Sequence, residues 1–541
     1  MRRVLLAAAF ASLLPVAAQA ARDELKIGTA QFPSSLHPAI DPEVIKYYVT
    51  SFAVRPLTAF TPDWQNSCLM CTELPSLANG LAKIEGNGMR VTLRLRPEMK
   101  WGDGTPVTAK DLEFTWKLGR DPSSGFSNFA PWNRATGLEM TGTHEAVLHL
   151  AEIRTNFANW NELVPAHLEQ AAAAGEPGTY VRQTLYNRAP TTPGLWNGPF
   201  LVSQYQSGAQ IVLEPNPHWG GQKPALKRII IKFIANTAAL QANLLSGDVD
   251  TTAVGLTTDQ ILALRKQYPD RFTYLARPTT GYEHIDLQRG NRLLQDIRIR
   301  RAMLHAVDRQ TLVDRIFEGT TRPASGFVAE LDPNYTDAVP QYGYDPARAR
   351  ALLAESGFTP GPDGICRNAA GERLSLDWVT TAGNRQRELV QQVFQNQWKS
   401  ACIDVVIKNE PARTYFGETL KKRSYTGLAL YNWVSSVGES PGQTLATRSI
   451  PTAENNWGGV NWSAFSDPEM EQLIARADRE LDPAAQKPLW ARMQQIYAEQ
   501  LWVLPLYHPT AMLVVPKWMK GMALTGHSDN GSLWAETWTP E

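Results

Sequence analysis

Strands and capped helices alternate along this chain, and that order constrains the fold more than any other feature of the sequence. Asp345-Pro346 and Asp467-Pro468 each place an N-cap acid directly before a proline at the first helical position. Short apolar or alternating runs predict strands over 25–29, 229–234 and 427–433. Because the two kinds of element follow one another, the sequence predicts a layered α/β fold.

Several further elements follow from the same signals. A strand of alternating polarity begins at Met89 and runs into a turn at 102–104. Thr108 then caps a helix, and Asp111 completes a capping box three residues later. The other predicted elements are two strands after Gly198, a helix over 238–246, one long amphipathic helix over 296–316, and strands over 374–380 and 403–407.

The balance of charge excludes one large class of function. The 541 residues include 53 Lys and Arg and 53 Asp and Glu residues. Proteins that bind nucleic acid carry a basic excess, which this chain lacks. An apolar share of 43%, taken with the length, predicts a folded protein of two or more lobes.

The N-terminus has the three parts of a secretory signal peptide at residues 1–20. Two arginines precede an apolar run over 4–14, and an A-x-A cleavage site follows at 18–20. The apolar run is too short to span a bilayer. The first cysteine is Cys68, so no cysteine directly follows the cleavage site to carry a lipid. We therefore expect a periplasmic protein that starts at Ala21 and has no lipid anchor.

The four cysteines suit an oxidising compartment. Cys68 and Cys71 form a C-x-x-C motif, but a zinc ribbon needs a second such motif, and Thr72 excludes haem attachment. We expect a local disulfide that pins a loop, with a redox pair as the alternative. Cys366 and Cys402 flank two predicted strands, and we expect them to pair with each other.

The segment 438–442 reads GESPG and matches the G-x-S-x-G nucleophile elbow of serine hydrolases. An elbow uses the backbone N–H of the residue after the serine in its oxyanion hole, and here that residue is Pro441. Losing one such donor costs about 3 kcal/mol of transition-state stabilisation. The residues that follow are also a poor helix start. We therefore do not expect Ser440 to be a nucleophile and expect no enzyme activity, and we keep an exported serine hydrolase as the less favoured alternative.

The histidines give no metal site. His144 and His149 superficially resemble an H-E-x-x-H motif, but their spacing is one residue too long. On a strand, which this segment resembles, an odd spacing puts the two rings on opposite faces. None of the nine histidines lies in a convincing ligand cluster, so we expect neither a bound metal nor a cofactor.

With these segments in view, the chain resembles the extracellular solute-binding proteins of family 5, the oligopeptide-, dipeptide- and nickel-binding components of ABC importers. No single segment is specific, but their order and spacing together are. The matching segments are LPSLANGL (74–81), LRLRPEMKWGDGTPVTAKDLEFTW (93–116), NGPFLVSQYQSGAQIVLEPNPHWGG (197–221), LLSGDVD (244–250), DIRIRRAMLHAVDRQTLV (296–313), YDPARARALLAESGF (344–358) and DPEMEQLIARADRELDP (467–483).

The resemblance implies a periplasmic-binding-protein fold of the type II-like class, with two lobes that close over a ligand through a hinge. It also implies an extra subdomain in the first lobe. The implied ranges are 21–281 plus 508–541 for the first lobe, about 41–190 for its extra subdomain, 282–507 for the second lobe, and 282–287 and 503–507 for the two crossings between the lobes.

The resemblance also points to the loop after the strand at 427–433. In peptide-binding members a carboxylate three residues after a strand-ending Trp holds the α-ammonium of the ligand. Here Tyr431 and Trp433 match the strand, but the third residue on is Ser436, and the nearest acid is Glu439. A buried ammonium without its counter-charge costs about 3–5 kcal/mol.

Two explanations of this departure stay open. Either Glu439 reaches back to bind an ammonium, or the ligand lacks a free amino group and contacts the hydroxyls of Ser435 and Ser436. We prefer the second at this stage. Both serines could also merely form the turn after the strand.

Other candidate ligand contacts are spread over both lobes. Phe32 and Tyr47 lie in first-lobe segments that face the cleft in relatives. Asn456 and Trp457 belong to a polar and aromatic loop, where an amide could bond a peptide backbone. Arg385 could bind a carboxylate bidentately.

The resemblance therefore implies the substrate-binding component of an ABC importer. It would capture a peptide-like small solute and deliver it to an inner-membrane permease with its ATPase. A sugar-like metabolite or a metal complex is the alternative solute. An exported hydrolase acting at Ser440 and a chaperone- or adhesin-like use of the cleft are the competing roles. We expect a monomer with no nucleic-acid partner.

Overall fold

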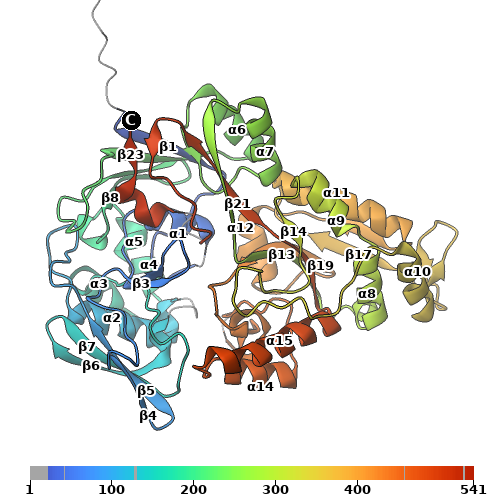
Figure 1. The fold of residues 1–541 in the computed structure, drawn as a ribbon, viewed down its shortest axis with the longest axis horizontal. Coiled ribbons are helices and arrows are strands. Elements are labelled where there is room, and N and C mark those ends of the chain that lie inside the picture. The colour runs from blue at the N-terminus through green and yellow to red at the C-terminus, as the bar shows by residue number, and fades with distance from the viewer. Residues whose placement is uncertain (1–21, 42, 127–130, 456, 528–530) are drawn as a thin grey trace, which may run out of the picture.

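The computed structural model describes residues 22–541 apart from 42, 127–130, 456 and 528–530. The expected signal peptide therefore lies outside the described residues. The chain forms two bodies that lie side by side, with the first half of the sequence on the left of Figure 1 and the yellow and orange segments on the right. Strands and helices are mixed in both, so the predicted α/β class is confirmed.

The left body is built on a five-stranded sheet in the order β11-β1-β10-β9-β8. Strand β1 pairs in parallel with β10 and β11, whereas β9 is antiparallel to β10 and β8. Strand β1 lies between β11 and β10, and its apolar residues Leu25 and Ile27 are fully buried there. The strands are β1 (Glu24–Thr29), β8 (Phe200–Gln206), β9 (Gln210–Pro215), β10 (Arg228–Phe233) and β11 (Thr251–Thr252).

A second sheet, in the order β4-β5-β7-β6, forms a separate layer at the lower left of Figure 1. Its own apolar core draws on residues 57–163. Helix α2 (Ala109–Arg120) covers this core, and Thr108 and Asp111 form the predicted capping box at its start. The strands are β4 (Ala82–Glu85), β5 (Gly88–Arg94), β6 (Ala135–Gly142) and β7 (Glu145–Leu150), with the small hairpin of β2 (Thr58–Phe60) and β3 (Asn66–Cys68) beside them.

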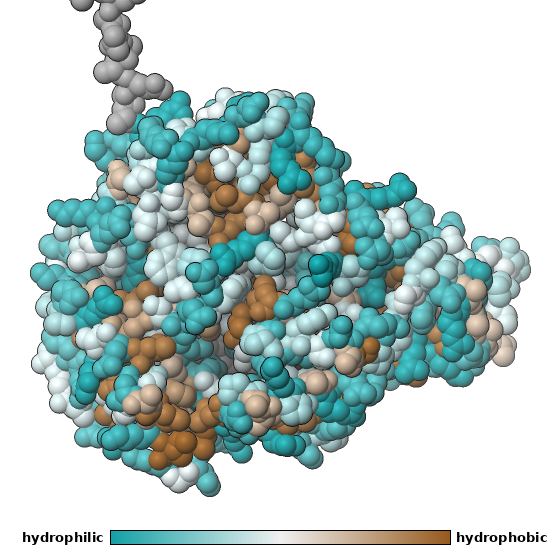
Figure 2. All heavy atoms as spheres, in the orientation of Figure 1, coloured by the Kyte–Doolittle hydropathy of each residue, from teal (hydrophilic) through white to brown (hydrophobic). Residues whose placement is uncertain are grey.

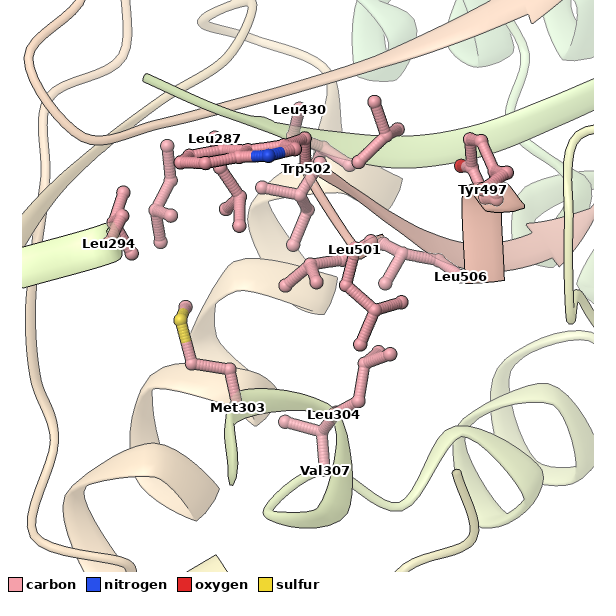
Figure 3. Close-up of a cluster of buried hydrophobic side chains, with 14 of the residues drawn as sticks. Leu287, Leu294, Met303, Leu304, Val307, Leu430, Tyr497, Leu501, Trp502 and Leu506 are labelled. Atoms are coloured by element: carbon pink, nitrogen blue, oxygen red, sulfur yellow. The ribbon is translucent and has the colours of Figure 1, made fainter. Parts of the chain in front are cut away.

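The right body contains a six-stranded sheet in the order β14-β20-β13-β19-β17-β18. All seven residues of β13 are buried, because helices or loops cover both faces of the sheet. Figure 3 shows side chains from the strands and from the helices beside them meeting in one core, with the Trp502 ring lying across Leu287 and Leu430. The strands are β13 (Gly281–Leu287), β14 (Arg322–Pro323), β17 (Ser375–Val379), β18 (Asp404–Ile407), β19 (Leu428–Val434) and β20 (Val503–His508).

The helices surround these sheets. In the left body they are α1 (Val44–Thr50), α3 (Ala166–Ala173), α4 (Tyr180–Gln183), α5 (Leu185–Arg188), α6 (Thr237–Ser246) and α7 (Thr258–Gln267). In the right body they are α8 (Ile297–His305), α9 (Arg309–Ile316), α10 (Pro346–Glu355), α11 (Arg385–Ser400), α12 (Ala412–Thr414), α13 (Gly442–Leu445), α14 (Pro468–Ala477) and α15 (Pro483–Gln500). Two further short ribbons pair β15 (Thr359–Pro360) with β16 (Cys366–Arg367) and β22 (Met519–Lys520) with β23 (Thr539–Pro540).

Two long strand paths join the bodies. Strand β12 (Phe272–Pro278) runs on into β13, and β20 runs on into β21 (Thr510–Pro516). Strand β12 pairs with β21 on one side, and β13 pairs with β20 on the other. We call residues 22–281 and 508–541 the first lobe and residues 282–507 the second lobe. These boundaries remain our proposal, and the core clusters support it, because each one draws its described residues from a single lobe.

The prediction of one long helix over 296–316 is wrong. The chain forms α8 and α9 instead, with a break between His305 and Arg309. Asp308 starts the second helix because its carboxylate accepts a hydrogen bond from the backbone N–H of Thr311 (2.9 Å). The apolar spacing continues across the break, and this periodicity conceals the new N-cap.

The cysteines pair within single lobes. A disulfide joins Cys68 at the end of β3 to Cys71, with 5.3 Å between their Cα atoms. A second disulfide joins Cys366 to Cys402, with 5.0 Å between their Cα atoms. The second bond ties the β16 ribbon to the end of α11, so it cross-links the second lobe at its periphery.

A buried ion pair fastens α11 to β13. Arg387 Nε lies 2.6 Å from Glu283 Oε1, and both side chains are nearly inaccessible (13% and 5% exposed). Removing one partner of a buried pair leaves the other charge uncompensated, so we expect Arg387→Met to lower the free energy of unfolding by about 3–5 kcal/mol. The measurement is urea unfolding followed by tryptophan fluorescence.

The matched control is Arg492→Met, which removes an exposed pair with Glu469 (2.7 Å) on the same lobe. That change should cost about 0–1 kcal/mol, because solvent screens the charges. Equal unfolding midpoints for the two variants would contradict the role given to Arg387.

Candidate functional site

The loop that follows β19 is the centre of the candidate site. The strand ends at Val434, and the chain then turns, with the Glu439 N–H donating to the Ser436 carbonyl (3.1 Å). Gly438 lies in this turn with φ +70°, a left-handed conformation that glycine adopts without strain. Thr280, at the crossing between β12 and β13, donates its hydroxyl to the Ser435 carbonyl. The loop is therefore tied to the junction of the two lobes.

This loop forms one wall of a small cavity. Ser435, Ser436 and Glu439, three of the residues singled out in the sequence, lie together there. Apolar side chains, one threonine and one further acid make up the rest of the wall. The lining residues are Thr280, Phe327, Val328, Ala329, Asp332, Ser435, Ser436, Glu439, Pro441 and Trp490. Figure 2 shows apolar residues gathered near the centre of the view, along the boundary between the lobes.

The Glu439 side chain turns back toward Ser436, the position at which peptide-binding members carry an acid. Its carboxylate accepts hydrogen bonds from the Gln443 side-chain amide (2.9 Å) and from the Ser436 backbone N–H (3.4 Å). Burial raises the pKa of Glu439, and the positive charge of Arg134 in the first lobe opposes that rise. The carboxylate therefore lies in a poorly hydrated place where any added positive charge would be favourable.

Asp332 is the second acid of the cavity. Its carboxylate accepts the backbone N–H groups of Gly438 (2.7 Å) and Asn334 (2.8 Å), and burial raises its pKa. The bond to Gly438 fixes the tip of the loop, so Asp332 both lines the cavity and shapes its wall. No basic side chain is among the lining residues of this cavity in the described part of the chain.

The contacts of Ser440 differ from those of a catalytic nucleophile. Its hydroxyl donates to the carboxylate of Asp478, which follows α14. Within the described residues no histidine hydrogen-bonds this serine. A single helical turn, α13, does follow Pro441, although the sequence there favours a helix poorly. The proline still lacks the N–H that an oxyanion hole requires.

Tyr431 and Trp433 lie on β19 but belong to the interior of the second lobe. The Tyr431 hydroxyl donates to Asp286 Oδ2 (2.5 Å), and burial raises the pKa of Asp286 to about 7. The half-buried Trp433 ring packs edge-on against Trp462, with 6.1 Å between the ring centroids. Neither residue lines the cavity, so these aromatic rings support the strand that carries the loop.

The first-lobe candidates lie outside this cavity. The Phe32 ring packs against Tyr205, with 5.6 Å between centroids, at the edge of the first-lobe core. Tyr47 is half-buried on α1, and the Lys46 ammonium lies 4.6 Å from its ring centroid. We keep both as proposed contacts for a ligand larger than the cavity itself.

Trp457 and Arg385 lie in the second lobe, and neither lines the cavity. Trp457 is half-buried in a turn, where its N–H donates to the Thr452 carbonyl (2.7 Å). Asn456 lies outside the described residues. Arg385, at the start of α11, is exposed, and its Nε lies 3.8 Å from Asp259 Oδ2 of the first lobe. This arginine therefore bridges the lobes in the structure, and carboxylate binding by it remains a proposal.

Sequence reasoning missed Asp332, Thr280 and Arg134. Asp332 precedes a proline, as many turn residues do, and Thr280 belongs to a hinge without a motif. Arg134 is about 300 residues from Glu439 along the chain, so only the three-dimensional fold relates them. A search for acids flanking the Ser435 loop would have found Glu439 alone.

The described residues contain neither a membrane-spanning helix nor a cluster of metal ligands. No helix of that part of the chain is both long enough and apolar enough to cross a membrane. In the same residues, no group of three or more His, Cys, Asp and Glu side chains is arranged to hold a metal ion.

Comparison with known proteins agrees with this architecture. Residues 73–452 match the family described as bacterial extracellular solute-binding proteins, family 5. An oligopeptide-binding protein from Thermus thermophilus, solved with a pentapeptide, superposes with a TM-score of 0.84 and 29% identity over 96% of both chains. The probable D,D-dipeptide-binding periplasmic protein DdpA of Escherichia coli K12 is 28% identical over 65% of this chain and 66% of its own length.

A third relative shows how widely the fold is used. NikZ from Campylobacter jejuni, solved with Ni(L-His), has a TM-score of 0.82 at 20% identity, covering 96% of this chain and 99% of that one. The two-lobed periplasmic-binding-protein fold is thereby confirmed. Because the family match spans well over half of the sequence, the chain belongs to the family 5 bacterial extracellular solute-binding proteins and is a binding protein, not an enzyme.

Proposed function

We propose that this protein captures a peptide-like solute in the cavity beside the β19 loop and delivers it to an inner-membrane ABC permease with its ATPase. The family supports the transport role, and the pentapeptide in the Thermus thermophilus relative supports the peptide class. Capture would take place in the periplasm, between lobes that close over the ligand.

The observation that carries the proposal is the joint position of Glu439 and Asp332 in one cavity wall. Peptides present cationic and N–H groups, and two carboxylates without a basic lining residue suit such donors. Apolar neighbours, among them Phe327 and Trp490, would exclude water and cover the chain of the ligand.

The same geometry changes our preference between the two explanations of Ser436. Because Glu439 turns back to the Ser436 N–H, a carboxylate is already present beside the position that lacks an acid. Its raised pKa means that an ammonium would relieve the cost of burying it. We therefore propose that Glu439 is the anchor for a free amino group, with Ser435 and Ser436 as neutral partners.

Native mass spectrometry of the protein, purified gently from a periplasmic extract, tests the substrate class. We expect a co-purified peptide with a free N-terminus. An N-blocked peptide would overturn the role of Glu439 and restore the hydroxyl explanation. A sugar-like molecule or a metal complex would overturn the peptide class itself, and an empty protein would be followed by a thermal-shift screen of those three classes.

The charge of Glu439 predicts how affinity depends on pH and on the ligand's N-terminus. N-acetylation of a bound peptide should weaken binding about 10²–10³-fold, because it removes the cation that the carboxylate faces. Affinity for the free-amine peptide should fall as the pH drops through the raised pKa of Glu439, since protonation of the carboxylate competes with the ligand. Isothermal titration calorimetry across that pH range measures both effects.

Two variants complete this experiment. Glu439→Gln should bind the free-amine peptide more weakly and should lose the acidic fall in affinity. Glu454→Gln changes an exposed acid of the same lobe and should keep the wild-type profile. An unchanged pH profile in Glu439→Gln would show that another group titrates with binding.

A further inference from the structure

A compact polar contact joins the two lobes beside the cavity. It involves the segment after β7 in the first lobe and the residues that follow α14 in the second. The Thr155 N–H donates to the Asp478 carbonyl (2.8 Å), and Arg154 donates to the Asp478 carboxylate (3.0 Å). Arg479 reaches in the opposite direction and donates to Glu152 (2.7 Å). Each lobe thus supplies both a donor and an acceptor to the same junction.

Asp478 is the residue on which this junction converges. One carboxylate oxygen lies within 3.0 Å of Arg154 and 3.7 Å of Arg448, and the other accepts the Ser440 hydroxyl. Its side chain is 17% exposed, so its charge is screened less than that of a surface acid. Asp478 therefore bonds to the first lobe and to the β19 loop at the same time.

Ser440 connects that junction to the cavity. Its two neighbours in the chain, Glu439 and Pro441, both line the cavity wall. Because Ser440 lies between them, a displacement of the wall moves its hydroxyl relative to Asp478. The covalent and hydrogen-bonded path runs from the cavity wall through Ser440 and Asp478 to Arg154.

We propose that Ser440 and Asp478 are positioning residues that couple the ligand-lining loop to the first lobe. With the loop in the position seen here, Ser440 completes the contacts of Asp478, and Asp478 in turn holds Arg154 and Thr155. Ligand release then requires this junction to break, so both residues govern the dissociation rate without touching the ligand. The inference rests on the proposed function only in taking the cavity as the ligand's site.

The lobe–lobe distance tests the proposal without any ligand. Fluorescence labels on Lys83→Cys of β4 and Lys487→Cys of α15, both exposed positions in opposite lobes, report the fraction of closed molecules. Asp478→Asn should lower that fraction, and Ser440→Ala should lower it less. Raising NaCl from about 50 mM to about 500 mM should open the wild type more than Asp478→Asn, because the variant loses the ion pair with Arg154 and keeps only the one between Arg479 and Glu152. A purely structural role would not change this salt response.

The matched control is Glu469→Gln on α14, the helix that ends at Asp478, because the Glu469 carboxylate accepts a hydrogen bond from Arg492 within one lobe (2.7 Å). It should leave both the closed fraction and the salt response unchanged. The proposal is overturned if Asp478→Asn and Ser440→Ala behave as the wild type, or if Glu469→Gln shifts the closed fraction equally. Thermal unfolding of each variant identifies loss of fold.

Stopped-flow kinetics with a free-amine pentapeptide give the second readout. Asp478→Asn should raise the dissociation rate about tenfold and leave the association rate nearly constant, since contacts that form after encounter act on release. If the pentapeptide does not bind the wild type, the proposed peptide class fails, whereas the closed fraction still decides the role of Asp478.

Discussion

The rest of the structure depends on the double crossing of the chain between its two lobes. Strand β12 continues into β13 and β20 into β21, and each pair is hydrogen-bonded on its own side of the crossing. The linking residues are bonded as well, with the Thr279 hydroxyl donating to the Pro509 carbonyl (2.9 Å). We propose that relative motion of the lobes arises from a few backbone dihedrals at this point. Thr280, which lies within the crossing, also holds the loop that lines the cavity, so hinge and cavity share a residue.

The arrangement of two facing lobes also explains why carboxylates are buried in the cavity wall. A cleft between two lobes removes water from its walls when the lobes meet, and every carboxylate there must find donors or protonate. The Asp332 carboxylate accepts hydrogen bonds from two backbone N–H groups, so its role is to fix the shape of the loop. Glu439 accepts one side-chain amide, from Gln443 (2.9 Å), and one longer backbone bond, from the Ser436 N–H (3.4 Å), and it feels the positive charge of Arg134. The less satisfied acid is the one that gains most from a cationic ligand, and this difference in satisfaction is the physical basis for choosing Glu439 as the anchor.

The sequence predicts local structure well and long-range geometry poorly, and single residues show why. The capping box at Thr108 and Asp111 is a contact across three residues, so the printed sequence contains all of it. Asp308 is also local, yet the continuing apolar periodicity conceals its helix start. The positions of Ser435, Ser436 and Glu439 in one cavity wall could be anticipated because they share one loop. Asp332 and Arg134 could not, since nothing in their own neighbourhoods indicates which loop they will meet.

The GESPG segment matches the nucleophile-elbow motif, but its serine makes the contacts of a positioning residue. Ser440 lies half-buried after a tight turn that Gly438, with φ +70°, permits. What separates a nucleophile from a positioning residue is its partner. A histidine base would draw the proton from Ser440, whereas the carboxylate of Asp478 accepts its hydrogen bond and is itself held by Arg154. The same turn that could present a nucleophile to a substrate here presents a hydroxyl to the junction between the lobes.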